Sequence, residues 1–210
     1  VVAFVVGVIV SLFVWRLSVD FMREKEQDRF DFQVSEATDA IVDRMDAQRN
    51  VLRGGAGFFS DTDGVSRQEW STYAETLRPE KFLPGMQGFG FSLYLLPSDL
   101  PGHIEKIRME GFPDYSVRPV GKRAEYTAII YLEPFAIRNQ QAFGYDMFSE
   151  PVRRAAMERA RDTDRTTLSG RVTLVQELDE DGQAGFLMAV PVVRSDLPSE
   201  PYHQRPTDVL

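Results

Sequence analysis

The sequence predicts an α+β fold in which one long N-terminal helix precedes a domain with an antiparallel sheet. Residues 16–59 contain no proline and place apolar side chains three and four positions apart, which is the spacing of one helix face. From residue 61 onward, helical and strand patterns alternate. The last two strand patterns are joined by an acidic turn that ends in Asp181-Gly182, a dipeptide typical of β-hairpins.

The composition excludes several classes of function. The 210 residues include 32 acidic and 24 basic side chains, two histidines and no cysteine. A disulfide, a thiolate nucleophile and a cysteine-ligated metal are excluded, and we expect no metal and no cofactor. A net charge of −8 is a poor match for phosphates, so we expect no nucleic-acid partner. With 43% hydrophobic residues, the chain has enough apolar side chains to form a core.

The first 15 residues are compatible with the interior of a membrane. Residues 1–15 carry no charge, and Arg16 is the first charged residue. About 20 apolar residues are needed to span a bilayer, so we interpret this run as a truncated transmembrane helix. A signal peptide would need a small-residue cleavage site, whereas Trp15 fits a membrane interface. A buried core helix is the alternative.

Residues 16–60 are predicted to form a stalk helix with one apolar stripe. We expect it to loosen at Gly54, Gly55 and Gly57, before a turn over residues 61–64. The stripe can pack on the chain's own domain or, in a homodimer, on a second copy. It consists of Val34, Ala37, Ile41, Met45, Gln48, Leu52 and Gly55.

The following domain is predicted to begin with a helix. Ser66 and Glu69 have the spacing of a capping box, in which each side chain bonds a free backbone N–H group. Trp70, Tyr73 and Leu77 would form the buried face of this helix, and Pro79 would end it.

The remaining elements are predicted from apolar periodicity and turn residues. We expect strands over residues 88–96, 115–119 and 126–132, a helix over 99–110, and a helix over 150–162 with Ser149 as its N-cap. Strands over 165–178 and 184–193 would then form the hairpin.

Motifs of the common enzyme classes are missing from the sequence. It contains no G-x-S-x-G elbow, no phosphate-binding lysine loop and no H-E-x-x-H motif. The acidic turn at residues 61–64 lacks the spacing of a calcium loop. His103 and His203 are expected on the surface. We predict no catalytic residue and no metal site, and the alternative is a membrane-anchored enzyme with Asp146 or Glu133 as its acid or base.

A series of motifs between residues 126 and 193 resembles a known family. In order, they are Glu133-Pro134, Asn139, FGYDM over residues 143–147, RRAA over 153–156, TLSG over 167–170, VQE over 175–177, and GFL over 185–187 followed by VPV over 190–192. They resemble the CHASE family of extracytoplasmic sensor domains, found in bacterial histidine kinases, in cyclic-nucleotide signalling enzymes and in plant cytokinin receptors. The resemblance covers about residues 41–194. It implies a stalk helix followed by a PAS-like fold with a small-molecule pocket.

The resemblance also implies ligand-binding residues. Asp146 matches the aspartate that hydrogen-bonds adenine-type ligands in the plant receptors, and Leu168 matches a position whose backbone contacts that ligand. Asp146 alternatively caps the helix that follows it, and Leu168 alternatively belongs to the core. Further candidates for the pocket lining, each equally an ordinary core side chain, are Phe91, Tyr94, Tyr126, Ile130, Phe143 and Met147.

The resemblance therefore implies a non-enzymatic sensor domain over residues 61–194, with residues 195–210 as a truncated continuation. We expect an inner-membrane receptor whose soluble domain is periplasmic or extracellular. Its ligand would be a small molecule, with adenine-type compounds among the candidates. Its output module would be a kinase or cyclase. The mixed charges after Arg16 mildly favour this orientation. The alternative to ligand sensing is a dimerisation or partner-binding domain without a small ligand.

Overall fold

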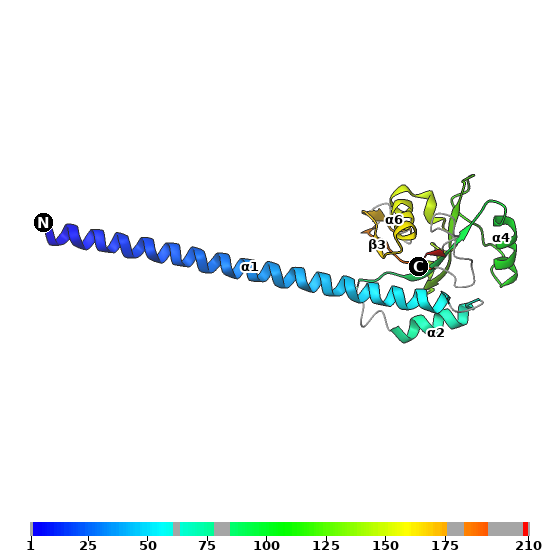
Figure 1. Ribbon diagram of the computed structural model, residues 1–210, viewed down its shortest axis with the longest axis horizontal. Coiled ribbons are helices and arrows are strands. Elements are labelled where there is room, and N and C mark those ends of the chain that lie inside the picture. The colour runs from blue at the N-terminus through cyan, green and yellow to red at the C-terminus, as the bar shows by residue number, and fades with distance from the viewer. Residues whose placement is uncertain (1, 61–63, 78–84, 176–182, 193–207, 210) are drawn as a thin grey trace. The chain divides into compact units, whose positions relative to one another are not determined.

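The computed structural model describes residues 2–60, 64–77, 85–175, 183–192 and 208–209. The helices are α1 (Val2–Ser60), α2 (Arg67–Leu77), α4 (Leu100–Met109), α5 (Ile137–Gln140) and α6 (Pro151–Thr163), with a 3-10 helix, η1 (Met147–Ser149) (Figure 1). The strands are β1 (Phe89–Leu95), β2 (Tyr126–Glu133), β3 (Thr167–Leu168), β4 (Val172–Thr173), β5 (Ala184–Gly185), β6 (Met188–Ala189), β7 (Pro191–Val192) and β8 (Asp208–Val209). All the strand pairs between these elements are antiparallel, so the α+β class is confirmed.

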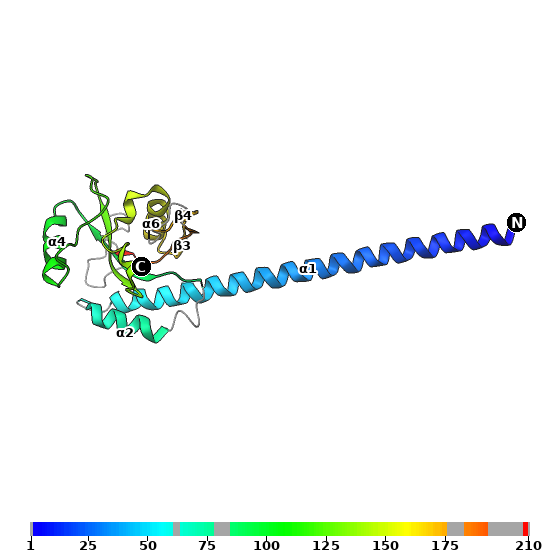
Figure 2. The same cartoon turned by 180° about the vertical axis from the view of Figure 1, so that it is seen from behind.

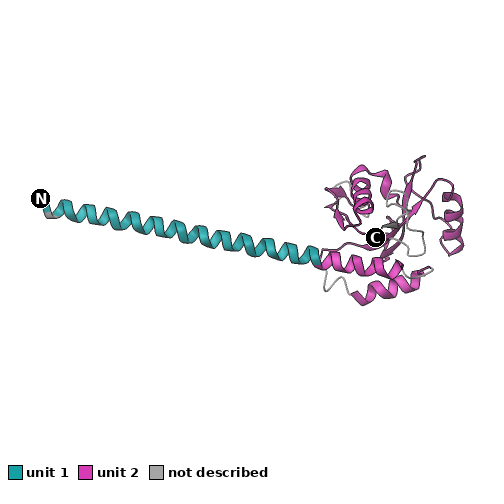
Figure 3. Ribbon diagram, in the orientation of Figure 1, with its two compact units in different colours: residues 1–46 teal, residues 47–210 magenta. Residues whose placement is uncertain are grey.

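The chain divides into two compact units, residues 1–46 and residues 47–210 (Figure 3). The described residues of the first unit all belong to α1. This helix is long and apolar enough near its N-terminus to cross a membrane, as judged by length and composition. The apolar side chains of this stretch, such as Ile9 and Phe13, are exposed in the single chain. The predicted long N-terminal helix is therefore confirmed.

The last turns of α1 belong to the second unit and bury one side of the helix. Gln48, Leu52, Gly55 and Phe59 are buried, which continues the predicted stripe by one more turn. The prediction that the glycines loosen the helix is wrong, because α1 continues to Ser60. A Cβ atom at Gly54 would lie 2.9 Å from the Tyr73 hydroxyl, so the glycine leaves room for α2.

Helix α2 begins with the predicted capping box. The Ser66 backbone N–H donates to Glu69 Oε2 at 2.8 Å, and the Glu69 N–H donates to Ser66 Oγ at 3.2 Å. The Ser66 hydroxyl and the Ser66 backbone N–H both donate to the Glu69 carboxylate, and these two hydrogen bonds lower the pKa of Glu69. Trp70 is buried between the rings of Phe59 and Phe89, with centroid distances of 5.1 and 4.6 Å. The predicted helix end at Pro79 lies outside the described residues.

Strands β1 and β2, which were both predicted as strands, pair with each other in a four-stranded sheet of order β2-β1-β8-β7, and the two faces of the pair pack on different helices. One face carries Phe89, Phe91 and Leu95 and packs on the end of α1, on α2 and on α4. The other face packs on α6 through Ile129 and Leu132. Figures 1 and 2 show α4 and α6 on opposite sides of this strand pair.

A β-bulge in β2 changes which residues share a face. Phe91 pairs with Tyr131, while the next residue, Ser92, pairs with Ile129, so Ile130 is an extra residue in β2. Ile129 and Leu132 are three positions apart and would face opposite sides of a regular strand. Because of the bulge, both lie on the side of α6.

Two predictions about the second half of the chain are corrected. Residues 115–119 form no strand and contribute one isolated bridge, between Arg118 and Tyr145, because Pro119 has no N–H for a ladder. Glu150, not Ser149, caps α6 by accepting hydrogen bonds from the next two free backbone N–H groups. Ser149 Oγ donates instead to the Asp146 carbonyl.

The predicted C-terminal hairpin is present only as short pairs. Strand β4 pairs with β5 and β3 pairs with β6, each over two residues, in the order expected for antiparallel segments. Ser169 interrupts the longer strand that we predicted, because its side chain binds the Leu187 N–H and the Gly170 carbonyl. The expected turn over residues 179–182 lies outside the described residues.

Candidate functional site

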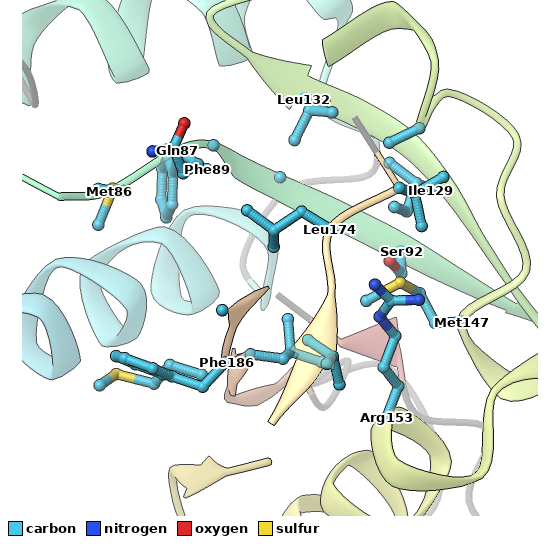
Figure 4. Close-up of a pocket in the computed structure, with 18 of the residues that line it drawn as sticks. Met86, Gln87, Phe89, Ser92, Ile129, Leu132, Met147, Arg153, Leu174 and Phe186 are labelled. Atoms are coloured by element: carbon cyan, nitrogen blue, oxygen red, sulfur yellow. The ribbon is translucent and has the colours of Figure 1, made fainter. Parts of the chain in front are cut away.

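A cavity of about 340 Å³ lies on the α6 side of the β1–β2 pair. Strand residues Gly90, Ser92, Ile129 and Leu132 line one wall, and Met147 of η1 with Met157 of α6 line another (Figure 4). The end of α1 contributes Gln48 and Leu52, and the β4 and β5 segments add Val172, Leu174 and Ala184. A mostly apolar concavity of this volume with few polar groups is typical of small-molecule sites.

The β2 bulge contributes to the shape of the cavity. It places both Ile129 and Leu132 on the cavity wall. Arg67 of α2 reaches β2 at this point, and its Nη1 donates to the carbonyl of Ile130, the extra residue. The carbonyl of a bulged residue is left without a regular ladder partner, and Arg67 supplies one.

Arg153 is the charged side chain among the described residues that line the cavity. It extends from α6 into the space below the strand pair (Figure 4) and is 5% exposed. Its Nη1 donates to the Tyr145 hydroxyl at 3.0 Å and its Nη2 to the Thr173 carbonyl at 2.6 Å. The sequence analysis missed this residue, although a signal was present. Arg153 shares a helix face with Ala156, Met157 and Ala160, so it is a charged residue on an otherwise apolar stripe.

Asp146 is completely buried, and its side chain is engaged with the protein. Its Oδ1 accepts hydrogen bonds from the N–H groups of Thr127 (2.9 Å) and Phe148 (3.1 Å), so Asp146 is the N-cap of η1. Its Oδ2 lies 3.3 Å from Arg123 Nη1, without hydrogen-bond geometry. The capping alternative thus applies to η1. Asp146 does not line the cavity, whereas the next residue, Met147, does.

The other predicted pocket residues lie around the cavity, not in its lining. Phe91 stacks on Phe59 at 4.0 Å, and Ile130 belongs to the same cluster on the opposite sheet face. Tyr126 and Phe143 pack near α4. Tyr94 packs on the α6 side, where burial raises its pKa with a further contribution from Glu125. Leu168 is 44% exposed in β3 and pairs with Met188.

The two histidines were expected on the surface, and for His103 this is wrong. It is 8% exposed in α4, and its Nε2 lies 2.9 Å from the Tyr115 hydroxyl. Desolvation, aided by Lys106 and Arg67, lowers the pKa of His103 to about 4, against a smaller opposite effect of Glu110. Burial also raises the pKa of Tyr115. His203 lies outside the described residues.

Comparison with known proteins identifies the family. The family model described as "CHASE domain" matches residues 63–210, more than two-thirds of the chain. The chain belongs to the CHASE domain family. CHASE domains are extracytoplasmic sensor domains of receptors and are not catalytic. No curated protein matches the sequence.

Several residues of the motifs that resemble the CHASE family form hydrogen bonds with segments next to the cavity. Asn139 is buried, and its Nδ2 donates to the carbonyls of Gln87 (3.1 Å) and Pro134 (2.9 Å). The Glu133 carboxylate accepts from the Phe135 N–H. The Gly144 N–H donates to the Ile129 carbonyl at 2.9 Å, so the FGYDM segment runs along the outer edge of β2. These motif residues therefore position segments beside the cavity.

Proposed function

We propose that this chain is the ligand-sensing part of a membrane signalling receptor of the histidine kinase or cyclase type. The observation that carries the proposal is the cavity between the β1–β2 pair and α6. It lies in a domain whose family is extracytoplasmic and sensory, and its lining combines apolar side chains with a few polar groups from Gln48, Ser92 and Arg153. Such a lining suits a small organic ligand.

The signal would begin with contacts between the ligand and α1. Gln48 and Leu52 line the cavity, and the same helix contains the apolar N-terminal segment. A ligand shifts the equilibrium between two arrangements of a receptor only by its different affinity for them. We propose that the bound ligand favours one position of Gln48 and Leu52, and that α1 carries this bias toward the membrane.

The proposal includes anchoring of the chain in the inner membrane, with the cavity-bearing domain on the periplasmic or extracellular side. The exposed apolar side chains near the N-terminus support it, since they are compatible with lipid. The chain has no cysteine, so a single introduced thiol reports its own position. In cells with an intact inner membrane, an impermeant maleimide should label a Ser98→Cys variant, because Ser98 is exposed. Labelling only after lysis of that membrane would contradict this placement.

We also propose Asp146 and Leu168, which lie next to the cavity and not in its lining, as ligand contacts. Asp146 Oδ2 is buried without a hydrogen bond within the part of the chain that the structure describes, and a ligand N–H is one group able to bind it. The Asp146→Asn variant keeps an acceptor for the N–H groups of Thr127 and Phe148. A direct contact predicts weaker ligand binding in this variant, whereas a purely structural cap, which asparagine retains, predicts unchanged ligand affinity.

The test of the sensor proposal is thermal unfolding of the 210-residue chain in lipid nanodiscs against a metabolite library that includes purines and cytokinin-like adenines. Binding to the folded state raises the melting temperature with ligand concentration. We expect at least one compound class to produce this shift. If no compound in a broad library changes the melting temperature, the sensor proposal fails and a partner-binding role takes its place.

A further inference from the structure

The electrostatics of the cavity indicate the charge of its ligand. Among the described residues that line it, Arg153 is charged and no aspartate or glutamate is present. Its guanidinium is buried, and Figure 4 shows the side chain pointing from α6 into the cavity, toward Ser92 and Met147. The described lining therefore has one positive charge and no negative charge.

The interactions of Arg153 with the protein involve neutral groups. Its two hydrogen-bond acceptors are the Tyr145 hydroxyl and the Thr173 carbonyl, and its guanidinium carbon lies 5.1 Å from the centre of the Tyr145 ring. Within the described ranges, no carboxylate forms an ion pair with it. The nearest carboxylate in sequence, that of Glu150, accepts the backbone N–H groups of Val152 and Arg153.

A buried cation without a counterion is unfavourable, and an anionic group placed beside it removes that cost. The guanidinium has five N–H donors in a planar fork that matches a carboxylate, and hydrogen bonds between charged groups are stronger than neutral ones. The rest of the wall is formed by apolar side chains such as Ile129, Leu132 and Leu174. These apolar contacts suit a hydrocarbon or aromatic body.

We propose that the cavity binds a small, mainly apolar carboxylic acid, and that Arg153 binds its carboxylate. The inference rests on the sensor function proposed above and specifies its ligand class. A volume of about 340 Å³ is at the lower end of the range for ligand sites, so the ligand is small.

The experiment compares matched acids and amides on the 210-residue chain in nanodiscs by titration calorimetry. The probes are phenylacetate against phenylacetamide and octanoate against octanamide, which differ in charge and hardly in shape. At least one acid should bind about tenfold or more tightly than its amide, because a hydrogen bond to a charged partner contributes about 1.5–3 kcal/mol.

Three variants test whether the tighter binding of the acid depends on Arg153. Arg153→Gln should weaken binding of the acid about tenfold to a hundredfold and leave the amide within twofold. Arg154→Gln is the matched control, since Arg154 donates to the Phe148 carbonyl and does not line the cavity. Arg153→Lys, which keeps the charge, should bind the acid with intermediate affinity. If Arg153→Gln does not fold, the acid–amide comparison on the unaltered chain still tests whether the cavity prefers a carboxylate.

Two outcomes would overturn the inference in different ways. If an acid and its amide bind equally, or if only neutral library compounds bind, the carboxylate assignment is wrong and the sensor proposal stands. If neither these probes nor any library compound binds the folded chain, both proposals fail.

Discussion

Among the described glycines, Gly144 is the one at which an added Cβ atom would make the closest contact. Its φ of +80° lies in a region that side chains rarely adopt, and a Cβ atom there would be 2.3 Å from the Ser116 carbonyl oxygen. We predict that Gly144→Ala lowers the free energy of unfolding by at least about 2 kcal/mol, measured by urea denaturation. In the control, Gly102→Ala, a Cβ meets nothing within 4 Å in helix α4, and stability should rise by up to about 1 kcal/mol. Equal effects of the two changes on the free energy of unfolding would show that position 144 does not require glycine.

His103 predicts a specific dependence of stability on pH. Its pKa falls from 6.5 to about 4 in the folded protein, so between these values the unfolded chain binds a proton that the folded protein does not. The stabilising contribution is therefore complete above pH 6.5 and is lost as the pH falls toward 4, by up to about 1.4 kcal/mol per pH unit. The difference between the unfolding free energies of the unaltered chain and His103→Gln should change across this window. A constant difference would contradict it.

Some features of single residues could be predicted from the sequence, and others could not. The spacing of Ser66 and Glu69 was sufficient to predict the capping box, because both partners are three residues apart. The burial of His103 was not predictable, because its partner Tyr115 is brought to it by the fold of the intervening loop. The same holds for Asp146, whose partners Thr127 and Arg123 lie about 20 positions away.

At the scale of elements, α2 and the β2 bulge are connected by Arg67. Its guanidinium binds the Ile130 carbonyl, pairs with Glu110 at 3.1 Å and lies 4.6–5.0 Å from the centres of three aromatic rings. We predict that Arg67→Met lowers the free energy of unfolding by about 1.5–3 kcal/mol and weakens ligand binding, because the bulge shapes the cavity wall. Gln68→Met, at the exposed neighbouring position, serves as the control. If Arg67→Met leaves the ligand affinity unchanged, the contact between Arg67 and the bulge does not affect the ligand site.

The elements that could be predicted are those whose sequence patterns are local. Strands β1 and β2 and helices α2, α4 and α6 carry clear local periodicities, and each was predicted near its observed bounds. The carbonyl of the bulged residue Ile130 binds Arg67, which lies more than 60 residues away in the sequence, so no local pattern indicates this contact. The short pairs of β3 to β6 depend on one another, and the prediction of two continuous strands was too simple there. The cavity is built from the bulge and these pairs, and of the predicted pocket residues, Met147 lines it.

At the scale of the whole molecule, we propose from the stripe on α1 that the chain forms a homodimer. Val34 and Ile41 are 48% and 63% exposed in the single chain and are spaced seven residues apart, as in a coiled coil. In membranes, an Ile41→Cys variant should form an intermolecular disulfide under mild oxidation, because facing stripe positions come close enough to be bridged. Asp39→Cys, on the other side of the helix, should cross-link much less. Equal cross-linking at the two positions would contradict pairing through this stripe.

The central claim is that the cavity beside the β1–β2 pair is where this CHASE domain binds its ligand. The most direct measurement is titration calorimetry of a Ser92→Leu variant with the compound that gives the largest melting shift. Ser92 is buried and lines the cavity, so leucine fills space that the ligand needs. Ser98→Leu, at an exposed position before α4, is the matched control. We predict at least a tenfold loss of affinity in Ser92→Leu with the fold retained, and none in Ser98→Leu. Unchanged affinity in a folded Ser92→Leu variant would contradict the claim.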